Sequence, residues 1–307
     1  MHKIFIDGSV GTTGLKIVER LKERKDLSLI TLPEEIRKDI NARKEALNQA
    51  DIAFLCLPDA AAIEAVSLVE NSKVKIIDTS TAHRTNPTWA YGFPELKGFK
   101  ESIEKSNRIA NPGCHASGFI SLVYPLVQAG LINKDENITC FSLTGYTGGG
   151  KKMIAEYESE DRPILFDAPR QYGLTQSHKH LPEMSKVCGL DNLPIFCPIV
   201  ADFPQGMEVT VPLFKSQLKG TINDVKEIYK SVYNGKIVKF VDNADEGGLL
   251  SANAMAGKDS MEISVFGNDD RILLVSRFDN LGKGASGAAI QNMNVILGIE
   301  ETTGLNI

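Results

Sequence analysis

The first hundred residues alternate short apolar runs with amphipathic helical patterns, and this alternation restricts the fold more than any other feature of the chain. After its first residue, the run DIAFLCL at 51–57 is uninterrupted by polar side chains, as expected of a strand covered on both faces of a sheet. In the first helical pattern, Leu15, Val18 and Leu21 share one face. Strands are predicted at 3–7, 27–32, 51–57 and 74–80, and helices at 11–24, 41–50 and 59–71. This order predicts an α/β Rossmann-type domain with a parallel sheet.

The pattern changes at residue 114. Residues 80–98 are polar and interrupted by proline, so we expect no core element there. After a helix expected from 115 to about 130, longer alternating runs indicate an α+β domain with a mixed or antiparallel sheet. These runs lie at 138–146, 194–200, 207–214, 236–242, 261–267 and 271–278. Because 307 residues exceed what one core usually holds, we expect two domains, 1–113 and 114–281.

Composition excludes several classes of protein. The formal charge of −5 gives no electrostatic reason to expect nucleic acid or an anionic membrane as a partner. The N-terminus has no signal-peptide pattern, and no apolar run approaches the roughly 20 residues that span a bilayer. The five cysteines contain no C-x-x-C pair, which argues against a disulfide framework or a zinc ribbon. A reducing cytoplasm is therefore expected, with Cys56, Cys140 and Cys197 as small buried residues.

A glycine-rich loop joins the first predicted strand to the first predicted helix. Gly8, Gly11 and Gly14 form a G-x-x-G-x-x-G pattern, one residue looser than the usual dinucleotide fingerprint. Glycines let the backbone approach a phosphate, and a helix N-terminus supplies N–H groups and a partial positive charge. The position at the start of a βαβ pattern predicts dinucleotide binding.

The identity of the dinucleotide stays open from these residues alone. After the second predicted strand, Glu34 and Glu35 could bind a ribose hydroxyl, as in NAD-binding proteins. Arg37 and Lys38 could instead bind the 2′-phosphate of NADP.

Cys114 stands in NPGC, where a strand should pass into a helix. A helix N-terminus is one of the environments that lower a thiol pKa, so this cysteine is predicted to be the nucleophile. The alternative is a helix-capping cysteine without a chemical role, although cysteine is a poor cap.

A cysteine nucleophile needs a proton-transfer partner, which is usually histidine. His178 and His180 share one face if their segment is extended, whereas His115 is expected to point elsewhere. An H-x-H metal site and a solvated polar loop are the alternatives. Since no further histidine or carboxylate cluster completes a metal centre, we predict that the protein has no metal site.

Two basic features could hold an anion. Ser80, Thr81 and Arg84 follow the fourth predicted strand, at the sheet edge where α/β proteins bind ligands. Lys151 and Lys152 follow three glycines that could form a backbone nest, although a plain surface turn is equally compatible. Together, these parts predict that a thiolate attacks an acyl carbonyl, phosphate leaves, and a nicotinamide hydride reduces the thioester.

Several motifs carry a family resemblance: GSVGTTG, DTSTAHR, YGFPEL, ANPGCHASGFI, HKHLPE and DNLGKGASGAAIQNMN, in order from residue 8 to 294. They resemble the shorter type of N-acetyl-γ-glutamyl-phosphate reductase, in the aspartate-semialdehyde dehydrogenase-like superfamily. The resemblance implies NADPH-dependent reduction of N-acetyl-γ-glutamyl phosphate to its semialdehyde and phosphate, in arginine biosynthesis. It implies a thioester on Cys114, with His180 as acid/base and His178 as second choice.

The resemblance also implies further roles. The residues expected to bind the cofactor are Gly8, Ser9, Val10, Gly11, Thr12, Thr13, Gly14, Pro58 and Asn280, the last near the nicotinamide. Ser80, Arg84 and Lys151 are expected at the acyl phosphate. Residues 114–281 would bind substrate and form a homo-oligomer, and the helix at about 282–307 would return to the first domain. His115 departs from the family, in which other aromatic residues commonly follow the cysteine.

Two alternatives keep part of this interpretation. An aspartate-semialdehyde dehydrogenase would use the same chemistry on a shorter substrate with a free amine, for which no clear acidic partner is visible. A non-catalytic, NADP-sensing Rossmann protein would have no need for a thiol at a helix start.

Overall fold

The computed structural model describes residues 1–307, and the chain divides into two compact units. The first unit comprises Met1–Pro94, Gly98–Gly113 and Ala285–Leu305. The second unit comprises Glu95–Lys97, Cys114–Gly284 and Asn306–Ile307. No helix in either unit has the length and apolar character needed to cross a bilayer.

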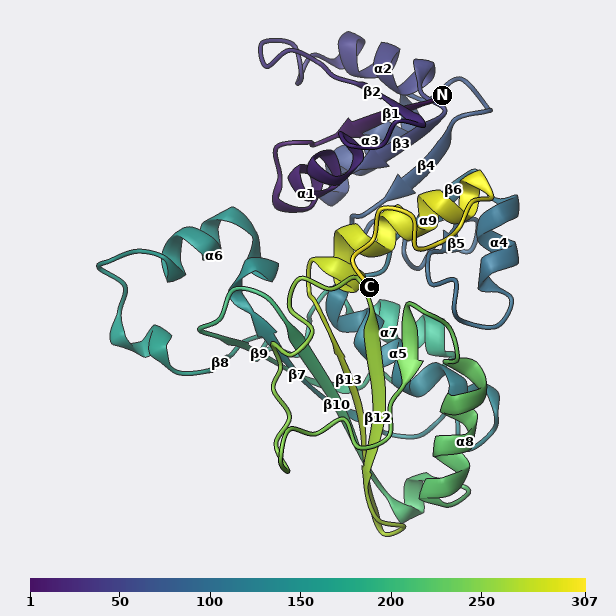
Figure 1. Ribbon diagram of the computed structural model, residues 1–307, viewed down its shortest axis with the longest axis vertical. Coiled ribbons are helices and arrows are strands. Elements are labelled where there is room, and N and C mark those ends of the chain that lie inside the picture. Colours follow the sequence, from purple (N-terminus) through teal and green to yellow (C-terminus); the bar gives the residue numbers. More distant parts are fainter. The chain divides into compact units, whose positions relative to one another are not determined.

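The first unit contains a six-stranded sheet in the order β2-β1-β3-β4-β6-β5 (Figure 1). Its strands are β1 (His2–Asp7), β2 (Leu27–Ile30), β3 (Ile52–Leu55), β4 (Lys75–Asp78), β5 (Ala90–Tyr91) and β6 (Arg108–Ala110). Every pairing in this sheet is parallel, which confirms the predicted α/β architecture.

Side chains of this sheet alternate between two hydrophobic cores. Ile4 and Ile6 of β1 pack on one face with Met293, whereas Phe5 packs on the other face with Leu47. The helices are α1 (Thr12–Leu21), α2 (Ile40–Gln49), α3 (Asp59–Ser67), α4 (Phe99–Lys105) and α9 (Gly287–Leu297). The first core takes side chains from α1, α4 and α9, and the second from α2 and α3. The sheet is therefore covered on both faces.

The stretch at 80–98 differs from its prediction. It contributes the edge strand β5, and Ala90, Tyr91 and Phe93 are buried. Polar side chains in the stretch are buried as well, because Asp78 and backbone carbonyl groups provide hydrogen-bond partners for them. The prediction of no core element at 80–98 was therefore wrong, because it was based on the polar composition of the stretch alone.

The second unit contains a seven-stranded sheet in the order β11-β12-β13-β10-β7-β9-β8. Its strands are β7 (Thr139–Gly145), β8 (Arg170–Gln171), β9 (Ile195–Ala201), β10 (Met207–Phe214), β11 (Val238–Phe240), β12 (Met261–Gly267) and β13 (Arg271–Phe278). The β11–β12 and β7–β9 pairs are parallel and the other pairs antiparallel, so the predicted mixed sheet is confirmed.

Helix α5 (Cys114–Gln128) packs against β10 and β13 on one face of this sheet. The approach is close, since a Cβ atom on Gly118 would lie 2.3 Å from Cγ2 of Val209. The other helices are α6 (Gly150–Tyr157), α7 (Leu181–Cys188) and α8 (Ile222–Val232), and both α7 and α8 contact α5. Helix α5 is consequently the central element of the second unit.

The opposite face of the same sheet carries exposed apolar side chains. On β7, Cys140 is buried while Phe141 is 44% exposed, and on β13 Leu274 is buried while Leu273 is 42% exposed. Ile195 on β9 is 59% exposed. An apolar sheet face open to solvent is unusual for a monomer and is typical of an interaction surface.

Candidate active site

The loop between β1 and α1 is built around glycine. Gly8 has a φ of +86°, and a Cβ atom there would lie 2.2 Å from the carbonyl oxygen of Cys56. A Cβ atom on Gly14 would lie 2.3 Å from the carbonyl oxygen of Gly8. Gly11 caps α1 without a side-chain hydrogen bond, so the first-turn N–H groups at Thr12 and Thr13 face no capping side chain. The loop therefore has the geometry of a phosphate cradle.

A cleft of about 380 Å³ adjoins this loop within the first unit. The predicted cofactor residues that line it are Gly8, Ser9, Val10, Gly11 and Pro58. Arg37 and Lys38 also line it, whereas Glu34 and Glu35 do not. Glu34 instead forms an ion pair with Arg37 at 3.3 Å. The cleft has the volume, the backbone cradle and the cationic residues that a dinucleotide phosphate requires.

A buried ion pair in the lining of the cleft was not anticipated from the sequence. Arg43 donates from Nε to Asp7 at 3.0 Å and from Nη1 to Glu64 at 2.8 Å. Burial raises the pKa of Asp7 above its usual value, and the nearby Arg43 only partly offsets this effect. The Nη2 atom of Arg43 is buried without a hydrogen-bond partner. The sequence feature that could have indicated this pair is Asp7, because a carboxylate at the end of an apolar strand requires a charged or hydrogen-bonding partner.

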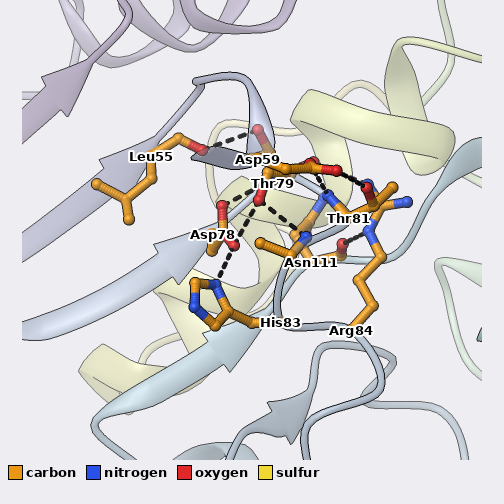
Figure 2. Close-up of polar contacts among 10 residues, drawn as sticks. Leu55, Asp59, Asp78, Thr79, Thr81, His83, Arg84 and Asn111 are labelled. Carbon is orange, nitrogen blue, oxygen red and sulfur yellow. Dashed lines mark hydrogen bonds and ion pairs between the residues drawn. The ribbon is translucent and has the colours of Figure 1, made fainter. Parts of the chain in front are cut away.

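A second polar cluster follows β4 (Figure 2). Asp78 is fully buried, accepts hydrogen bonds from the backbone N–H and hydroxyl of Ser80 at 2.9 and 2.7 Å, and pairs with Nδ1 of His83 at 2.6 Å. The His83 ring stacks on Trp89 at a centroid distance of 4.0 Å. The Ser80 hydroxyl is thus held by the Asp78 carboxylate at the sheet edge.

Arg84 links this cluster to the end of β6. Its Nε donates to the carbonyl oxygen of Asn111 at 2.9 Å, and its Nη2 donates to that of Thr79 at 2.7 Å (Figure 2). Thr81 hydrogen-bonds Asp59 through both its amide and its hydroxyl. Ser80 and Arg84 lie at the predicted edge of the sheet, and their roles toward an acyl phosphate stay predictions.

Cys114 is the first residue of α5 and is half-buried. Gly284 packs directly on it, since a Cβ atom there would lie 3.0 Å from Cβ of Cys114. Burial raises the pKa of the Cys56 thiol to about 12 and raises the pKa values of Cys140 and Cys188 as well. Those three thiols are held protonated, whereas Cys114 occupies the helix start that favours a thiolate.

Three histidine rings gather in the second unit near the start of α5. The His115 ring lies 5.7 Å from both the His178 and the His180 ring, and the latter two are 4.8 Å apart. The expectation that His115 points elsewhere was wrong, because the first turn of α5 directs its side chain into this cluster. His178 and His180 lie in a turn before α7 rather than in an extended segment, yet their rings are adjacent.

The partners of each ring differ. His115 is buried, with Nδ1 2.7 Å from the hydroxyl of Ser142 and Nε2 2.7 Å from that of Tyr172. Burial lowers the pKa of His115 to about 3, so this ring is neutral. Nδ1 of His178 accepts the backbone N–H of His180 at 3.2 Å, which leaves Nε2 as its proton-transfer atom. Burial also lowers the pKa of His178.

Asn280 and Lys151 lie in different surroundings. The Asn280 carbonyl accepts the N–H of Gly206 at 3.0 Å, and its amide donates to the hydroxyl of Thr147 at 3.0 Å. Lys151 is exposed in the first turn of α6, after a 3₁₀ turn formed by Tyr146–Gly149. The structure thus replaces the expected open glycine nest with a helical turn. The nicotinamide role of Asn280 and the phosphate role of Lys151 stay predictions.

These arrangements define the chemistry available to each unit. The first unit offers a phosphate cradle and a cationic cleft. The second unit offers a thiol at a helix start, next to imidazoles and phenolic and aliphatic hydroxyls, which is the residue set of nucleophilic acyl transfer.

The chain matches two family models that together span most of its length. Residues 3–106 match the model described as semialdehyde dehydrogenase, NAD binding domain. Residues 114–280 match the model described as semialdehyde dehydrogenase, dimerisation domain.

Curated relatives and solved structures agree with these matches. The chain is 49% identical over 306 residues to the N-acetyl-gamma-glutamyl-phosphate reductases of Brucella ovis and Brucella canis, covering 96% of this chain and 99% of each relative. Its fold is similar to that of aspartate semialdehyde dehydrogenase II from Vibrio cholerae, with a TM-score of 0.74 at 17% identity over 97% of this chain and 99% of that chain. For the Francisella tularensis enzyme the TM-score is 0.71 at 15% identity, over 97% and 100% of the two chains. The chain therefore belongs to the semialdehyde dehydrogenase family and, within it, to the N-acetyl-gamma-glutamyl-phosphate reductases.

Proposed function

We propose that this protein reduces N-acetyl-γ-glutamyl phosphate to N-acetylglutamate γ-semialdehyde and phosphate with NADPH, a step of arginine biosynthesis. One observation carries the proposal: a chain 49% identical to reductases of that name places Cys114 at the first residue of α5, in the unit that gathers three histidine rings. Free cysteines throughout the chain support a reducing compartment, and we assign the protein to the cytoplasm.

The steps follow from the residue set. The Cys114 thiolate adds to the acyl carbon, the bond from that carbon to the phosphate oxygen breaks, and phosphate leaves with the electron pair. A thioester on Sγ remains. A nicotinamide cofactor, which the glycine loop at Gly8–Gly14 would hold, would supply the hydride that reduces this thioester. Loss of the aldehyde then returns the electron pair of the carbon–sulfur bond to Cys114.

We assign proton transfer to His180, with His178 as the alternative. The departing phosphate oxygen takes up a proton, and an imidazole within the cluster is the group that can supply it. The backbone N–H contact fixes the His178 ring so that only Nε2 exchanges protons. His115 takes no part in proton exchange, because its pKa of about 3 keeps it neutral.

We propose NADP rather than NAD as the cofactor. Arg37 and Lys38 line the cleft and offer two cationic side chains to a phosphate. The carboxylate of Glu34 pairs with Arg37 and does not line the cleft. Charge-assisted bonds to a 2′-phosphate would favour NADPH.

The cofactor assignment is tested by reversing charge in the cleft. We expect Arg37→Glu combined with Lys38→Glu to raise the KM for NADPH by about tenfold or more, with a smaller change for NADH. Lys25→Glu, at an exposed position that does not line the cleft, is the matched control. Equal changes for both cofactors would argue against a 2′-phosphate site.

The substrate is tested in the reverse direction. Purified enzyme is given N-acetylglutamate semialdehyde, phosphate and NADP, and the rise in absorbance of NADPH is followed. Parallel reactions contain aspartate semialdehyde, or NAD, or lack phosphate. Phosphate-dependent reduction of NADP with the acetylated substrate alone is expected. Activity with aspartate semialdehyde alone would overturn the substrate assignment.

We also propose that the protein is a homo-oligomer that pairs through the open face of the second sheet. Phe141, Ile195 and Leu273 are exposed on that face. Contact of these apolar side chains with water is unfavourable, and a second copy of the chain that covers the face would remove this free-energy cost. The proposed partners are therefore the small acyl substrate, phosphate, the cofactor and a second copy of the chain.

A further inference from the structure

Ser142, His115 and Tyr172 form a chain of hydrogen bonds in the second unit. Ser142 lies on β7 and is fully buried, with its hydroxyl 2.7 Å from Nδ1 of His115. Tyr172 directly follows β8, and its hydroxyl is 2.7 Å from Nε2 of the same ring. The three residues lie far apart in the sequence, so only the fold brings them together.

The direction of these hydrogen bonds can be deduced from Ser142. Its hydroxyl hydrogen has one acceptor within reach, Nδ1 of His115, and a buried hydroxyl hydrogen needs an acceptor. Nδ1 therefore accepts, and the proton of the neutral ring lies on Nε2. Nε2–H then donates to the oxygen of Tyr172. The phenolic hydrogen is left to point away from His115, toward another acceptor.

The position of Tyr172 beside the first turn of α5 indicates where that acceptor lies. Its hydroxyl is held 2.7 Å from the ring of His115, the residue that directly follows Cys114 in that turn. Burial raises the pKa of the Tyr172 hydroxyl, and negative charge on Cys114 raises it further. An acyl group bound to the sulfur of Cys114 would therefore bring its oxygen near the Tyr172 hydroxyl.

We propose that Tyr172 donates a hydrogen bond to the acyl oxygen of substrate attached to Cys114, and that His115 is the positioning residue that turns the Tyr172 hydrogen toward it. The proposal rests on the assignment of Cys114 as nucleophile. Negative charge develops on this oxygen when sulfur or hydride adds to the carbonyl, so a fixed donor there stabilises the transition state. His115 stays neutral, so it holds the same orientation across the working pH range.

The titratable groups around the His115 ring are few. His178 and His180 face it from the turn before α7, Tyr172 faces it from the end of β8, and Cys114 precedes it on α5. His178 is the neighbour whose charge would further disfavour a proton on His115. The acid/base and the positioning functions are thus divided between neighbouring imidazoles.

The test compares two electrophiles that react with the same thiol. p-Nitrophenyl acetate acylates Cys114 through an oxyanion, whereas iodoacetamide alkylates it without one. We expect Tyr172→Phe to slow acylation by about 100-fold while alkylation stays near the wild-type rate. His115→Phe should act in the same way, and combining both changes should add little to Tyr172→Phe alone.

A conservative variant separates positioning from packing. His115→Gln places an amide N–H close to the position of Nε2–H, so we expect it to recover most of the acylation rate that His115→Phe loses. In turnover assays, kcat should fall while the KM for the acyl substrate changes little. Thermal unfolding of each variant reports whether it folds.

Three results would overturn the proposal: wild-type acylation in Tyr172→Phe, parallel loss of acylation and alkylation, or no recovery in His115→Gln. The acylation assay with p-nitrophenyl acetate does not depend on the identity of the natural substrate. If the wild-type enzyme fails in the semialdehyde assay but the acylation pattern holds, the proposed substrate is wrong and the assignment of Tyr172 stands.

Discussion

At the scale of single residues, the cysteine thiols of this chain differ in how far burial raises their pKa values. Cys56, Cys140 and Cys188 have pKa values raised by desolvation, so they are protonated near neutral pH. Cys114 is half-buried at the start of α5. Cys197 is half-buried as well, but it lies within β9 and not at a helix start. We therefore expect reactivity to be concentrated at Cys114.

We expect iodoacetamide to label Cys114 well before the other cysteines, and an acyl substrate to protect it. Peptide mapping by mass spectrometry after timed quenching measures the order of labelling. Cys114→Ser should abolish turnover and leave NADPH binding intact. Equal labelling of all five thiols would contradict an activated thiolate.

The His115 ring links stability to pH. Its pKa falls from 6.5 in the unfolded chain to about 3 in the fold, so the unfolded state binds one more proton between these values. The free energy of unfolding contributed by this site is therefore complete above pH 6.5 and falls as pH decreases, by about 1.4 kcal/mol per unit. Between pH 6.5 and pH 5 the loss is about 2 kcal/mol.

Urea unfolding at pH 5 and pH 7 tests this linkage. We expect wild type to lose about 2 kcal/mol more than His115→Gln over this interval, because glutamine does not titrate. His2→Gln, at an exposed position, should behave as wild type. The same pH dependence in His115→Gln as in wild type would show that another group is responsible.

The sequence allowed us to identify site residues that stand in short local motifs, but not the residues distant in sequence that hydrogen-bond to them. Cys114 and the histidine pair were singled out because NPGC and H-x-H are short patterns. Ser142 and Tyr172 lie 27 and 57 positions from His115, and no local pattern connects them. Arg43 was missed for the same reason, since its pairing with Asp7 spans 36 positions.

At the scale of elements, the backbone of the β1–α1 connection tolerates few substitutions at its glycines. Gly8 needs its left-handed backbone conformation, and Gly14 lies against the carbonyl of Gly8. The alternation of apolar runs and helical patterns predicted this connection well, because period-2 and period-3.6 patterns are local. The buried stretch at 80–98 was missed because its polar side chains find their partners only in the folded state.

We expect Gly14→Ala to raise the Kd for NADPH by about tenfold or more. The new methyl group would lie 2.3 Å from the Gly8 carbonyl oxygen, so the loop must shift and the phosphate cradle opens. Fluorescence titration measures the Kd. Gly235→Ala, where the nearest atom to the new Cβ is 4.0 Å away, is the matched control. Unchanged affinity in Gly14→Ala would show that the cofactor binds elsewhere.

At the scale of the whole molecule, the open face of the second sheet governs association. Alternation along its strands buries one set of side chains beneath α5 and exposes the other. The sequence indicated the alternating runs but could not tell which face would stay open, because that depends on where α5 packs.

We expect Phe141→Glu to convert the protein to a smaller species, because a buried, unpaired carboxylate at an interface is strongly unfavourable. Light scattering coupled to gel filtration measures the mass. Ile63→Glu, an exposed apolar position on α3 of the first unit, should leave the mass unchanged. A wild-type protein that already has the mass of one chain would refute the proposed oligomer.

The division of the chain also governs the order in which it can fold during synthesis. The first unit needs Ala285–Leu305, whose α9 places Ile290 and Met293 in the same core as β1. The ribosome releases that segment only after the whole of residues 114–284, long after the strands it covers. The first unit must therefore wait, with the face that carries Ile4 and Ile6 covered only by α1 and α4, until residues 114–284 have been translated. A gene shortened to its first 113 codons would yield a protein with that face partly exposed, and aggregation rather than an independent domain is the expected outcome.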